Sequence, residues 1–485
     1  MEDNNQKNVE TAKRQREHIA HDPNYNDISY RDRISTVKTD GSRNYLFPKV
    51  PQGKFANWRN ISGSFLLVLL LAFPLIKING NPIVLLNLIE RKFVIFGIVF
   101  WPQDTFIMLL MMLSFILFII LFTVTFGRIF CGWACPQTIF LEFVFRKIEK
   151  WIDGSPAKQR KLNEMPWNGH KIFKRLFKWL IFYAVSFILV NAILWYFMSF
   201  DKWLRYAVEM DQHVSGIALI FIFTTIFFGI YTWFREQICL IACPYGRMQG
   251  VLIDTSTIVI SYDYLRGEPR GHQKKGVTNE ETALGDCVDC HACVDVCPTG
   301  IDIRNGTQLE CVNCTACIDA CNSVMKKVDK PSGLIRYASE KEISTGKKPG
   351  FSPRIIAYSI VLLGLLSFFI TVLVTRAEVD AVILRTPGIL YQEVGPDSLS
   401  NLYNIKIINK TRIDKHVNIQ LIDMKGQVSI IGGEMTVPAE NKIESVLFVK
   451  LAKKDIIGKN INVKIGIYSE GKLIDDAKVS FISPN

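Results

Sequence analysis

Eight of the twelve cysteines in this chain form two consecutive runs with the same spacing. The first run reads C-x2-C-x2-C-x3-C-P and consists of Cys287, Cys290, Cys293 and Cys297. The second run is followed by Asn322 instead of proline and consists of Cys311, Cys314, Cys317 and Cys321. This spacing is typical of proteins with two [4Fe–4S] clusters, in which the fourth cysteine of each run binds the other cluster. We therefore expect one cluster on Cys287, Cys290, Cys293 and Cys321, and the other on Cys311, Cys314, Cys317 and Cys297.

Two other uses of closely spaced cysteines agree less well with this pattern. A structural zinc site usually takes two separated Cys-x-x-Cys pairs, and a disulfide framework distributes cysteines through a small secreted domain. Between residues 286 and 321 six acidic side chains face one base, Arg304. Negative charge near a cluster lowers its reduction potential, although a solvated acidic surface explains the same residues. We interpret His291, inside the first run, as a loop residue rather than a ligand.

The other four cysteines form a repeated motif. Cys131 and Cys135 are followed by Pro136, and Cys239 and Cys243 are followed by Pro244, so both motifs read Cys-x3-Cys-Pro, 108 residues apart. Residues four apart share one face of a helix, so each motif can present two thiols. If the two motifs pack symmetrically, four thiols converge. Cuprous copper, an iron–sulfur cluster, zinc and a dithiol–disulfide cycle all suit such a site, whereas a single buried cysteine needs no function.

Long apolar segments must position both motifs. Hydrophobic residues make up 49% of the chain, and its mean hydropathy is +0.18, so membrane spans are expected. A further apolar run, Phe93–Trp101, is too short to cross alone; it extends the second span or lies in the interface. The five expected spans are about Ile61–Ile76, Thr105–Thr125, Trp179–Phe200, Val214–Phe234 and Ile355–Thr375.

Basic residues predict how these spans are oriented. Residues 1–60, 127–178 and 235–354 hold 11, 11 and 15 Lys+Arg, whereas the loops 79–103 and 201–213 hold 2 each. The positive-inside rule places the first three segments in the cytoplasm and exports residues 376–485. The net charge of +12 follows from this distribution, so we do not expect nucleic acid as a partner. The motifs at Cys131 and Cys239 then lie at the cytoplasmic surface of the membrane.

The exported segment alternates apolar and polar residues over several short runs separated by turns, which predicts an immunoglobulin-like β-sandwich. We expect strands within 402–408, 417–422, 445–451, 461–467 and 478–482, and no metal role for His416. The fold class is thus a multi-domain membrane protein with a helical bundle, an α+β ferredoxin-like module and an all-β domain. Its expected parts are a polar segment (1–60), four spans with both thiol motifs (61–250), the 2[4Fe–4S] module (251–354), the last span (355–375) and the sandwich (376–485).

Histidines limit the redox chemistry that is possible inside the membrane. None of the seven histidines lies within an expected span: they are His18, His21, His170, His213, His272, His291 and His416. A transmembrane haem would need such ligands. We therefore expect electrons to remain on the cytoplasmic side, where the expected clusters and thiols lie.

This order of parts resembles the CcoG/FixG/RdxA family of accessory proteins for assembly of cbb(3)-type cytochrome c oxidase. The resemblance covers nearly the whole chain and depends on the combination of the two Cys-x3-Cys-Pro motifs, the ferredoxin runs and the exported sandwich. The membrane part is also similar to quinol-dehydrogenase subunits of periplasmic nitrate reduction, which lack the long exported domain. The resemblance implies a multi-pass protein of a bacterial inner membrane.

The resemblance further implies an oxidoreductase that reduces Cu(II) to Cu(I) for the oxidase. Cys131, Cys135, Cys239 and Cys243 become the expected catalytic or copper-binding residues, and the eight ferredoxin cysteines the cluster ligands. Thiolates stabilise cuprous copper. Expected partners are the lipid bilayer, oxidase subunits or assembly factors, a copper transporter or chaperone, and a cytoplasmic electron donor. Two alternatives stay open: a quinol-linked electron carrier and a non-catalytic assembly scaffold.

Overall fold

In the computed structural model the chain divides into two compact units. Unit 1 comprises residues 1–75 and 113–364, and unit 2 comprises residues 76–112 and 365–485. The structure describes residues 35–38, 40–78, 80–209, 214–272, 284–347, 350, 352–388, 390–395, 397–431, 435–456, 458–469 and 471–484. The expected polar segment is therefore described only from residue 35, and His18, His21 and His213 lie outside the described residues.

Five helices in the described part of the chain are long and apolar enough to cross a membrane, which confirms the expected number. They are α3 (Lys54–Ala72), α4 (Thr105–Phe126), α9 (Gly169–Leu194), α11 (Val214–Gly229) with its continuation η4 (Ile230–Phe234), and α18 (Pro353–Val374). The first and third begin earlier than their apolar segments predict. Their polar starts continue the helix beyond the apolar part, because helical hydrogen bonding does not depend on hydropathy.

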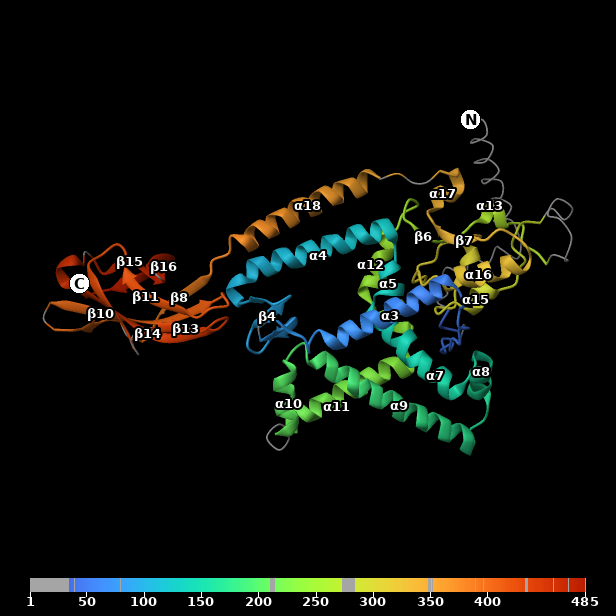
Figure 1. Cartoon of the computed structure of the whole chain (residues 1–485), viewed down its shortest axis with the longest axis horizontal. Helices are drawn as coiled ribbons and strands as arrows, with labels where there is room; N and C mark the ends of the chain where they lie inside the picture. The colour runs from blue at the N-terminus through green and yellow to red at the C-terminus, as the bar shows by residue number, and fades with distance from the viewer. Residues whose placement is uncertain are drawn as a thin grey trace. The chain divides into compact units, whose positions relative to one another are not determined.

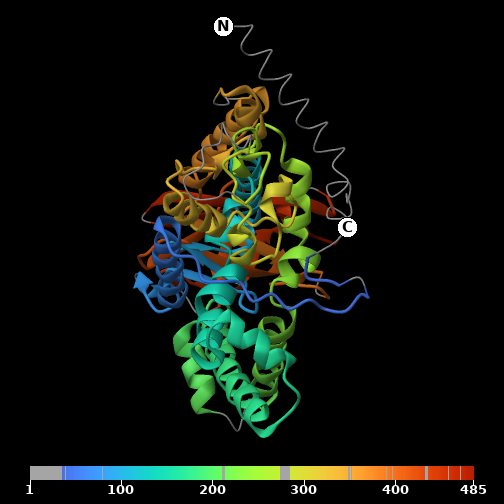
Figure 2. The same cartoon turned by 90° about the vertical axis from the view of Figure 1, so that its right-hand side faces the viewer.

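The helices of unit 1 pack through aromatic side chains. α9 and α11 lie side by side (Figure 1, Figure 2). The π-helical segment η2 (Phe140–Phe145) leads into α7 (Arg146–Asp153) and α8 (Pro156–Glu164). Its Phe145 ring stacks on Tyr231 with centroids 4.5 Å apart and meets Phe182 edge-on. Aromatic pairs of this kind add about 1 kcal/mol beyond the area they bury, so they stabilise the contact of η2 with α9 and η4.

The ferredoxin-like module of unit 1 combines short helices with one pair of strands, as the sequence predicts. β6 (Val259–Tyr262) pairs antiparallel with β7 (Ile335–Ala338). The helix α15 (Ala292–Asp295) lies within the first cysteine run and contains Cys293, and α16 (Ala316–Lys327) begins within the second run and contains Cys317 and Cys321. Ile260, Met325, Leu334 and Ile335 are almost fully buried between them.

The start of the first membrane helix is held by this module. The backbone N–H groups of Phe55 and Ala56 donate to the two carboxylate oxygens of Asp319, at 3.3 and 2.7 Å. Asp319 lies in α16, two residues before Cys321, and is buried. A carboxylate that accepts from the first turn of a helix satisfies N–H groups that have no intrahelical partner. The sequence position of Asp319 gives no hint of this role.

Unit 2 contains the expected sandwich. One sheet has the order β12-β14-β10-β8, with β9 also paired to β10, and the other has the order β13-β11-β15-β16. All five predicted strands are present: β10 (Ser398–Asn409), β11 (Lys415–Leu421), β14 (Lys442–Ala452), β15 (Asn460–Ser469) and β16 (Lys472–Ile482). Four of the predictions lie within the longer observed strands, whereas β11 begins two residues before the predicted range 417–422 and ends one residue before its end. Inward residues such as Tyr403, Ile405, Leu447 and Ile465 form a fully buried core. The strands that the sequence analysis missed are β8 (Val379–Arg385), β9 (Gln392–Glu393), β12 (Gly426–Ile430) and β13 (Met435–Val437).

Most of Phe93–Trp101 lies in two short strands, so the expectation that it extends the second span was wrong, and its place in the membrane interface stays a prediction. β3 (Val84–Asn87), β4 (Lys92–Ile95) and β5 (Ile98–Phe100) make one antiparallel sheet. The tight turn between β4 and β5 takes positive φ at Phe96 and Gly97, which ends any helix. Unit 2 is further joined by the buried Asp104, which pairs with Lys410 at 2.6 Å and Arg376 at 3.1 Å.

Candidate iron–sulfur and thiol sites

Two small cavities in the ferredoxin-like module are each lined by one expected set of cluster ligands. The first cavity is lined by Cys287, Cys290, Cys293 and Cys321. The second is lined by Cys297, Cys311, Cys314 and Cys317, and Cys293 also reaches it. The fourth cysteine of each run thus lies at the cavity formed by the other run. This is the interleaved arrangement that two-cluster ferredoxins use.

Both cysteine runs fold in the same way locally. Asp289 and Asn313, two residues after the first cysteine of each run, have φ of 52° and 53°, and His291 and Thr315 have φ of 52° and 66°. Asn, Asp and His tolerate this left-handed region better than most residues. The repeated turns bend the backbone around each cavity, so three closely spaced thiols face one centre. This explains why the spacing between these cysteines is two residues.

The cysteine side chains in these cavities are better suited to bind a cluster than to remain as free thiols. Burial raises the pKa of Cys293, Cys311 and Cys321 to about 12, so these thiols would stay protonated at neutral pH without a metal centre. Thiolates are the ligands of iron–sulfur clusters. Within the described ranges, no three His, Cys, Asp or Glu side chains converge on a single ion. A cubane holds its four ligands farther apart than one ion does, so the residues present fit [4Fe–4S] clusters.

A buried arginine organises the loop of the first cavity. Arg304 lines that cavity, and its guanidinium pairs with Asp302 at 2.6 Å and also with Asp289. Its Nη2 lies 3.0 Å from Nδ1 of His291. The imidazole of His291 thus contacts Arg304 through one nitrogen and Asp289 through the other, and its side chain is 60% exposed. The only base in this region of the sequence therefore neutralises acids at the edge of a cluster cavity.

The two Cys-x3-Cys-Pro motifs end in the same backbone conformation, although Cys131 lies in an α-helix and Cys239 in a π-helix. The N–H of Cys135 bonds to the carbonyl of Phe130 at 2.9 Å, and the N–H of Cys243 bonds to the carbonyl of Ile238 at 2.8 Å. Cys135 and Cys243 are both extended, with a proline starting the next helix. We had expected the two cysteines of each motif to share one helix. In the structure they do not, because the helix ends before the second cysteine. The proline causes this, since it disfavours helical conformation in the preceding residue.

Side chains exchanged between the two motifs hold them together. The hydroxyls of Thr123 and Tyr245 lie 3.1 Å apart, and Tyr231 donates to Gln137 at 2.7 Å. Arg128 donates to the carbonyl of Gly246. These contacts connect each half of the repeat to the other half. The symmetric packing that the sequence suggested is present in unit 1.

The four thiols of these motifs lie in one neighbourhood. Burial raises the pKa of Cys131 to about 11, and Cys135 and Cys243 act in the same direction, although Arg128 opposes them. Burial likewise raises the pKa of Cys239 to about 12, with further contributions from Cys135, Cys131 and Cys243. Each of these two thiols is therefore close to cysteines of both motifs. Such thiols stay protonated at neutral pH unless a cation is bound.

The first thiol motif packs directly against the second cluster cavity. A Cβ on Gly132 would lie 2.5 Å from the carbonyl oxygen of Val312 and 3.0 Å from the backbone of Asn313, so only glycine fits. Cys131 packs on the apolar group that contains Val312 and Cys314. The Nε of Arg59 donates to the carbonyl of Gly132 at 2.9 Å. The sequence analysis identified neither Gly132 nor Arg59.

The spans, the paired cysteine cavities and the sandwich define a multi-pass membrane iron–sulfur protein. Family models agree with each part: a 4Fe-4S dicluster domain matches residues 234–340, a 4Fe-4S binding domain matches residues 108–154, and the IG-like fold at the C-terminal of FixG matches residues 369–484.

Full-length relatives extend the match to most of the chain. Protein RdxA of Cereibacter sphaeroides is 33% identical over 78% of this chain and 82% of its own length. Protein RdxB of the same organism is 32% identical over 85% and 90%. Nitrogen fixation protein FixG of Rhizobium meliloti is 30% identical over 81% and 82%. A crystal structure of a FixG-related protein from Vibrio parahaemolyticus matches 22% of this chain and 95% of its own, at 19% identity and a TM-score of 0.19. The chain belongs to the FixG/RdxA family.

Proposed function

We propose that this chain is an oxidoreductase that reduces Cu(II) to Cu(I) at the four thiols of its Cys-x3-Cys-Pro motifs, for assembly of a cbb(3)-type cytochrome c oxidase. The observation that carries this proposal is the packing of the Cys131 loop on the second cluster cavity through Gly132 and Val312. A redox site and a soft-ligand site that share a backbone contact suit electron transfer to a thiol-bound metal. When bound, the two clusters supply electrons one at a time, which matches the one-electron reduction of Cu(II).

The chemistry of the four thiols explains why the Cu(I) product would stay bound. Cys131 and Cys239 are protonated at neutral pH, because burial keeps both pKa values far above 7. A copper ion that binds them displaces the protons, and thiolates prefer the cuprous over the cupric state. Arg128, which lowers the pKa of Cys131, favours this ionised form. Reduction and capture thereby occur at one place.

Location and partners belong to the same proposal. The asymmetry of basic residues supports an inner-membrane protein whose ferredoxin-like module faces the cytoplasm and whose sandwich faces the periplasm. An unidentified electron donor would then reach the module from the cytoplasm. Oxidase subunits or assembly factors would meet the sandwich, and a copper transporter or chaperone would exchange copper with the thiols.

The test of this function compares the wild type with a variant that has serine at residues 131, 135, 239 and 243. Both are purified without oxygen, reduced, and mixed with Cu(II) in the presence of a dye that reports Cu(I). We expect rapid Cu(I) formation in the wild type and at least a tenfold slower rate in the variant. Low-temperature EPR must show the same cluster content in both. Equal rates would remove the copper chemistry from these cysteines.

One observation favours a second use of the same four residues. The match to a 4Fe-4S binding domain covers residues 108–154, which contain only Cys131 and Cys135. Two cysteines cannot complete a [4Fe–4S] ligand set, but the neighbouring Cys239 and Cys243 would bring the number to four. Iron and acid-labile sulfide analysis separates the two uses. Eight irons per chain leave the thiols for copper, whereas twelve, falling to eight in the serine variant, would assign them to a third cluster.

A further inference from the structure

A cavity of about 240 Å³ opens in unit 1 beside the polar end of α3. Its walls come from segments far apart in the sequence, among them Val50, Arg59, Phe143, Lys147 and Pro298. Pro298 directly follows Cys297, so the cavity adjoins the second cluster site. Apolar walls with a few convergent polar groups are typical of small-ligand sites.

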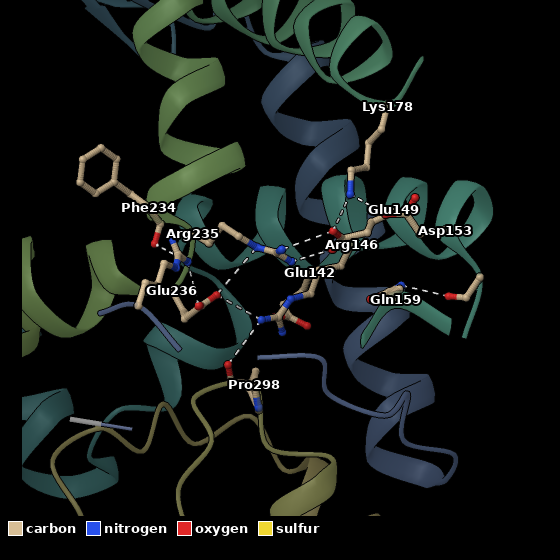
Figure 3. Close-up of polar contacts among 12 residues, drawn as sticks. Glu142, Arg146, Glu149, Asp153, Gln159, Lys178, Phe234, Arg235, Glu236 and Pro298 are labelled. Carbon is tan, nitrogen blue, oxygen red and sulfur yellow. Dashed lines mark hydrogen bonds and ion pairs between the residues drawn. The ribbon is translucent and has the colours of Figure 1, made fainter. Parts of the chain in front are cut away.

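The charges around this cavity are strongly unequal. Six Lys or Arg side chains line it against two glutamates. Three of the cations have carboxylate partners. Arg146 pairs with Glu142 and Glu236, and Arg235 pairs with Glu149 (Figure 3). Lys49 pairs with Asp295. Both glutamates are therefore already engaged with these arginines. The other three cations that line the cavity therefore have no free carboxylate in its walls to pair with. They are Arg59, Lys147 and Lys150.

Arg59 is such a cation. Only 7% of its surface is exposed, and its Nε donates to the carbonyl of Gly132. Its Nη2 is buried and has no hydrogen-bond partner within the described part of the chain. Burying a guanidinium without a counter-ion is costly, because the charge loses its hydration. A ligand that accepts from Nη2 would remove that cost.

Lys147 places a second cation at the Phe143 ring, and no carboxylate among the described residues pairs with it. Its Nζ lies 5.3 Å from the centre of the Phe143 ring, and the guanidinium carbon of Arg59 lies 5.4 Å from the same ring. The ring attracts both cations, but it cannot neutralise two positive charges that repel each other. Arg59 is buried and Lys147 is exposed, so an anion could enter beside Lys147 and reach Arg59.

We infer that this cavity binds the phosphate group of an anionic ligand between Arg59 and Lys147. A guanidinium and an ammonium are the groups that bind phosphate in proteins. The phosphate could belong to an anionic phospholipid, whose headgroup lies at the depth of the polar end of a membrane helix, or to a soluble phosphate compound. The apolar walls at Val50 and Phe143 would contact the rest of the ligand. This inference goes beyond the proposed function and does not depend on copper chemistry.

The test uses the full-length, cluster-loaded protein in a neutral detergent at low ionic strength. The midpoint of thermal unfolding is measured with short-chain phosphatidylglycerol, with phosphatidylcholine of the same chain length, and with inorganic phosphate. Sodium chloride at equal ionic strength is the reference. We expect phosphatidylglycerol to raise the midpoint and phosphatidylcholine to raise it less, because ligands of the folded state stabilise it. If inorganic phosphate also raises the midpoint, the phosphate group alone suffices; if it does not, the ligand is a lipid.

Variants locate the effect. Lys147→Gln should weaken binding about tenfold, the loss of one charge-assisted contact, and Arg59→Gln at least as much. Lys161→Gln, an exposed lysine of α8 that does not line the cavity, is the matched control and should bind like the wild type. Since Arg59→Gln could disturb the neighbouring cluster loop, Lys147→Gln is decisive. The inference is overturned if no anion exceeds sodium chloride, or if Lys147→Gln responds like the wild type.

Discussion

The hydroxyl of Tyr231 donates to Oε1 of Gln137 at 2.7 Å, across the interface between the two thiol motifs. The positions 108 residues away from each of them meet as Thr123 and Tyr245, with hydroxyls 3.1 Å apart. Thr123 and Tyr231 occupy equivalent positions of the two halves, as do Gln137 and Tyr245. Each half therefore makes the same contact with the other half. This exchange brings the cysteines of both motifs into one neighbourhood, although they are far apart in the sequence.

Gly132 brings the first thiol motif into contact with the wall of the second cluster cavity. Gly132→Ala places a methyl group 2.5 Å from the carbonyl oxygen of Val312, and overpacking of this kind costs roughly 1–3 kcal/mol. We expect the Cys131 loop to move away, so Cu(I) formation should slow by at least tenfold while the clusters remain. Anaerobic copper reduction and EPR measure both.

Gly169→Ala is the matched control for this variant, since nothing lies within 4 Å of the added methyl group. It should reduce copper like the wild type. If Gly132→Ala keeps the full rate, the contact with Val312 is not part of the route to the thiols.

Arg304 should raise the reduction potential of the first cluster. Its positive charge lines that cavity and stabilises the more negative, reduced state. Arg304→Gln also removes the guanidinium that pairs with Asp302 and Asp289, so the potential should fall by an amount on the order of 50 mV. A redox titration followed by EPR gives both potentials. The second cluster is the internal reference, and an equal shift of both clusters would contradict a local effect.

Asp319 should stabilise unit 1 by capping the first membrane helix. Asp319→Ala removes both acceptors of the Phe55 and Ala56 N–H groups, which should lower the free energy of unfolding by about 1–2 kcal/mol. Asp319→Asn keeps one acceptor and should lose less. Thermal unfolding in detergent distinguishes the two variants. Equal losses in both would show that the charge, rather than hydrogen bonding, stabilises this end of α3.

Glu149 should make the free energy of unfolding of unit 1 depend on pH in the acidic range. It pairs with Arg235 at 2.7 Å and with Lys178 at 3.2 Å, and Figure 3 shows both cations pointing at its carboxylate. Burial alone would raise the pKa of Glu149, but these cations lower it from 4.5 to about 2. A carboxyl group whose pKa falls on folding stabilises the protein above its unfolded pKa. That stability is lost as the pH falls from about 4.5 towards 2.

Glu149→Gln should therefore be less stable than the wild type at pH 7, by about 3 kcal/mol because two buried cations lose a partner. Between pH 5.5 and 3 the wild type should lose more stability than the variant, so the two curves converge. Helical circular dichroism during heating at each pH gives this difference. Glu164→Gln, at an exposed position of α8, is the control and should follow the wild type.

The sequence predicted two sets of four cysteines, and each set lines one cavity of the ferredoxin-like module. The spacing of a cluster-binding run is fixed by local backbone turns, so Cys287 and its partners could be assigned without a structure. Alternation likewise predicted the strands around Tyr403 and Ile465, because their side chains face one core. Apolar character did not predict that Phe93–Trp101 forms strands rather than an extension of the second span, because a turn at Gly97 and strand pairing within unit 2 decide the structure there.

Tertiary contacts account for what could not be predicted. Gly132 and Arg59 are ordinary residues in the sequence, and their importance follows from Val312 and Phe143, which are remote in the chain. The cations that line the cavity beside α3 come from the segment before α3, from α3 itself, and from helices near residues 147 and 235. Only folding shows that Arg59 and Lys147 share one aromatic ring.

The most direct test of the proposed copper reduction is a single-turnover measurement in which the electrons stored on the clusters are counted. The protein is photoreduced without oxygen, the reductant is removed, and Cu(II) is added while cluster absorbance and Cu(I) are followed together. If the clusters reduce copper, their absorbance returns at the rate at which Cu(I) forms, with one Cu(I) for each electron stored. With serine at residues 131, 135, 239 and 243, the clusters should stay reduced. Cluster reoxidation without Cu(I), or an unchanged rate in that variant, would contradict the proposed copper reduction.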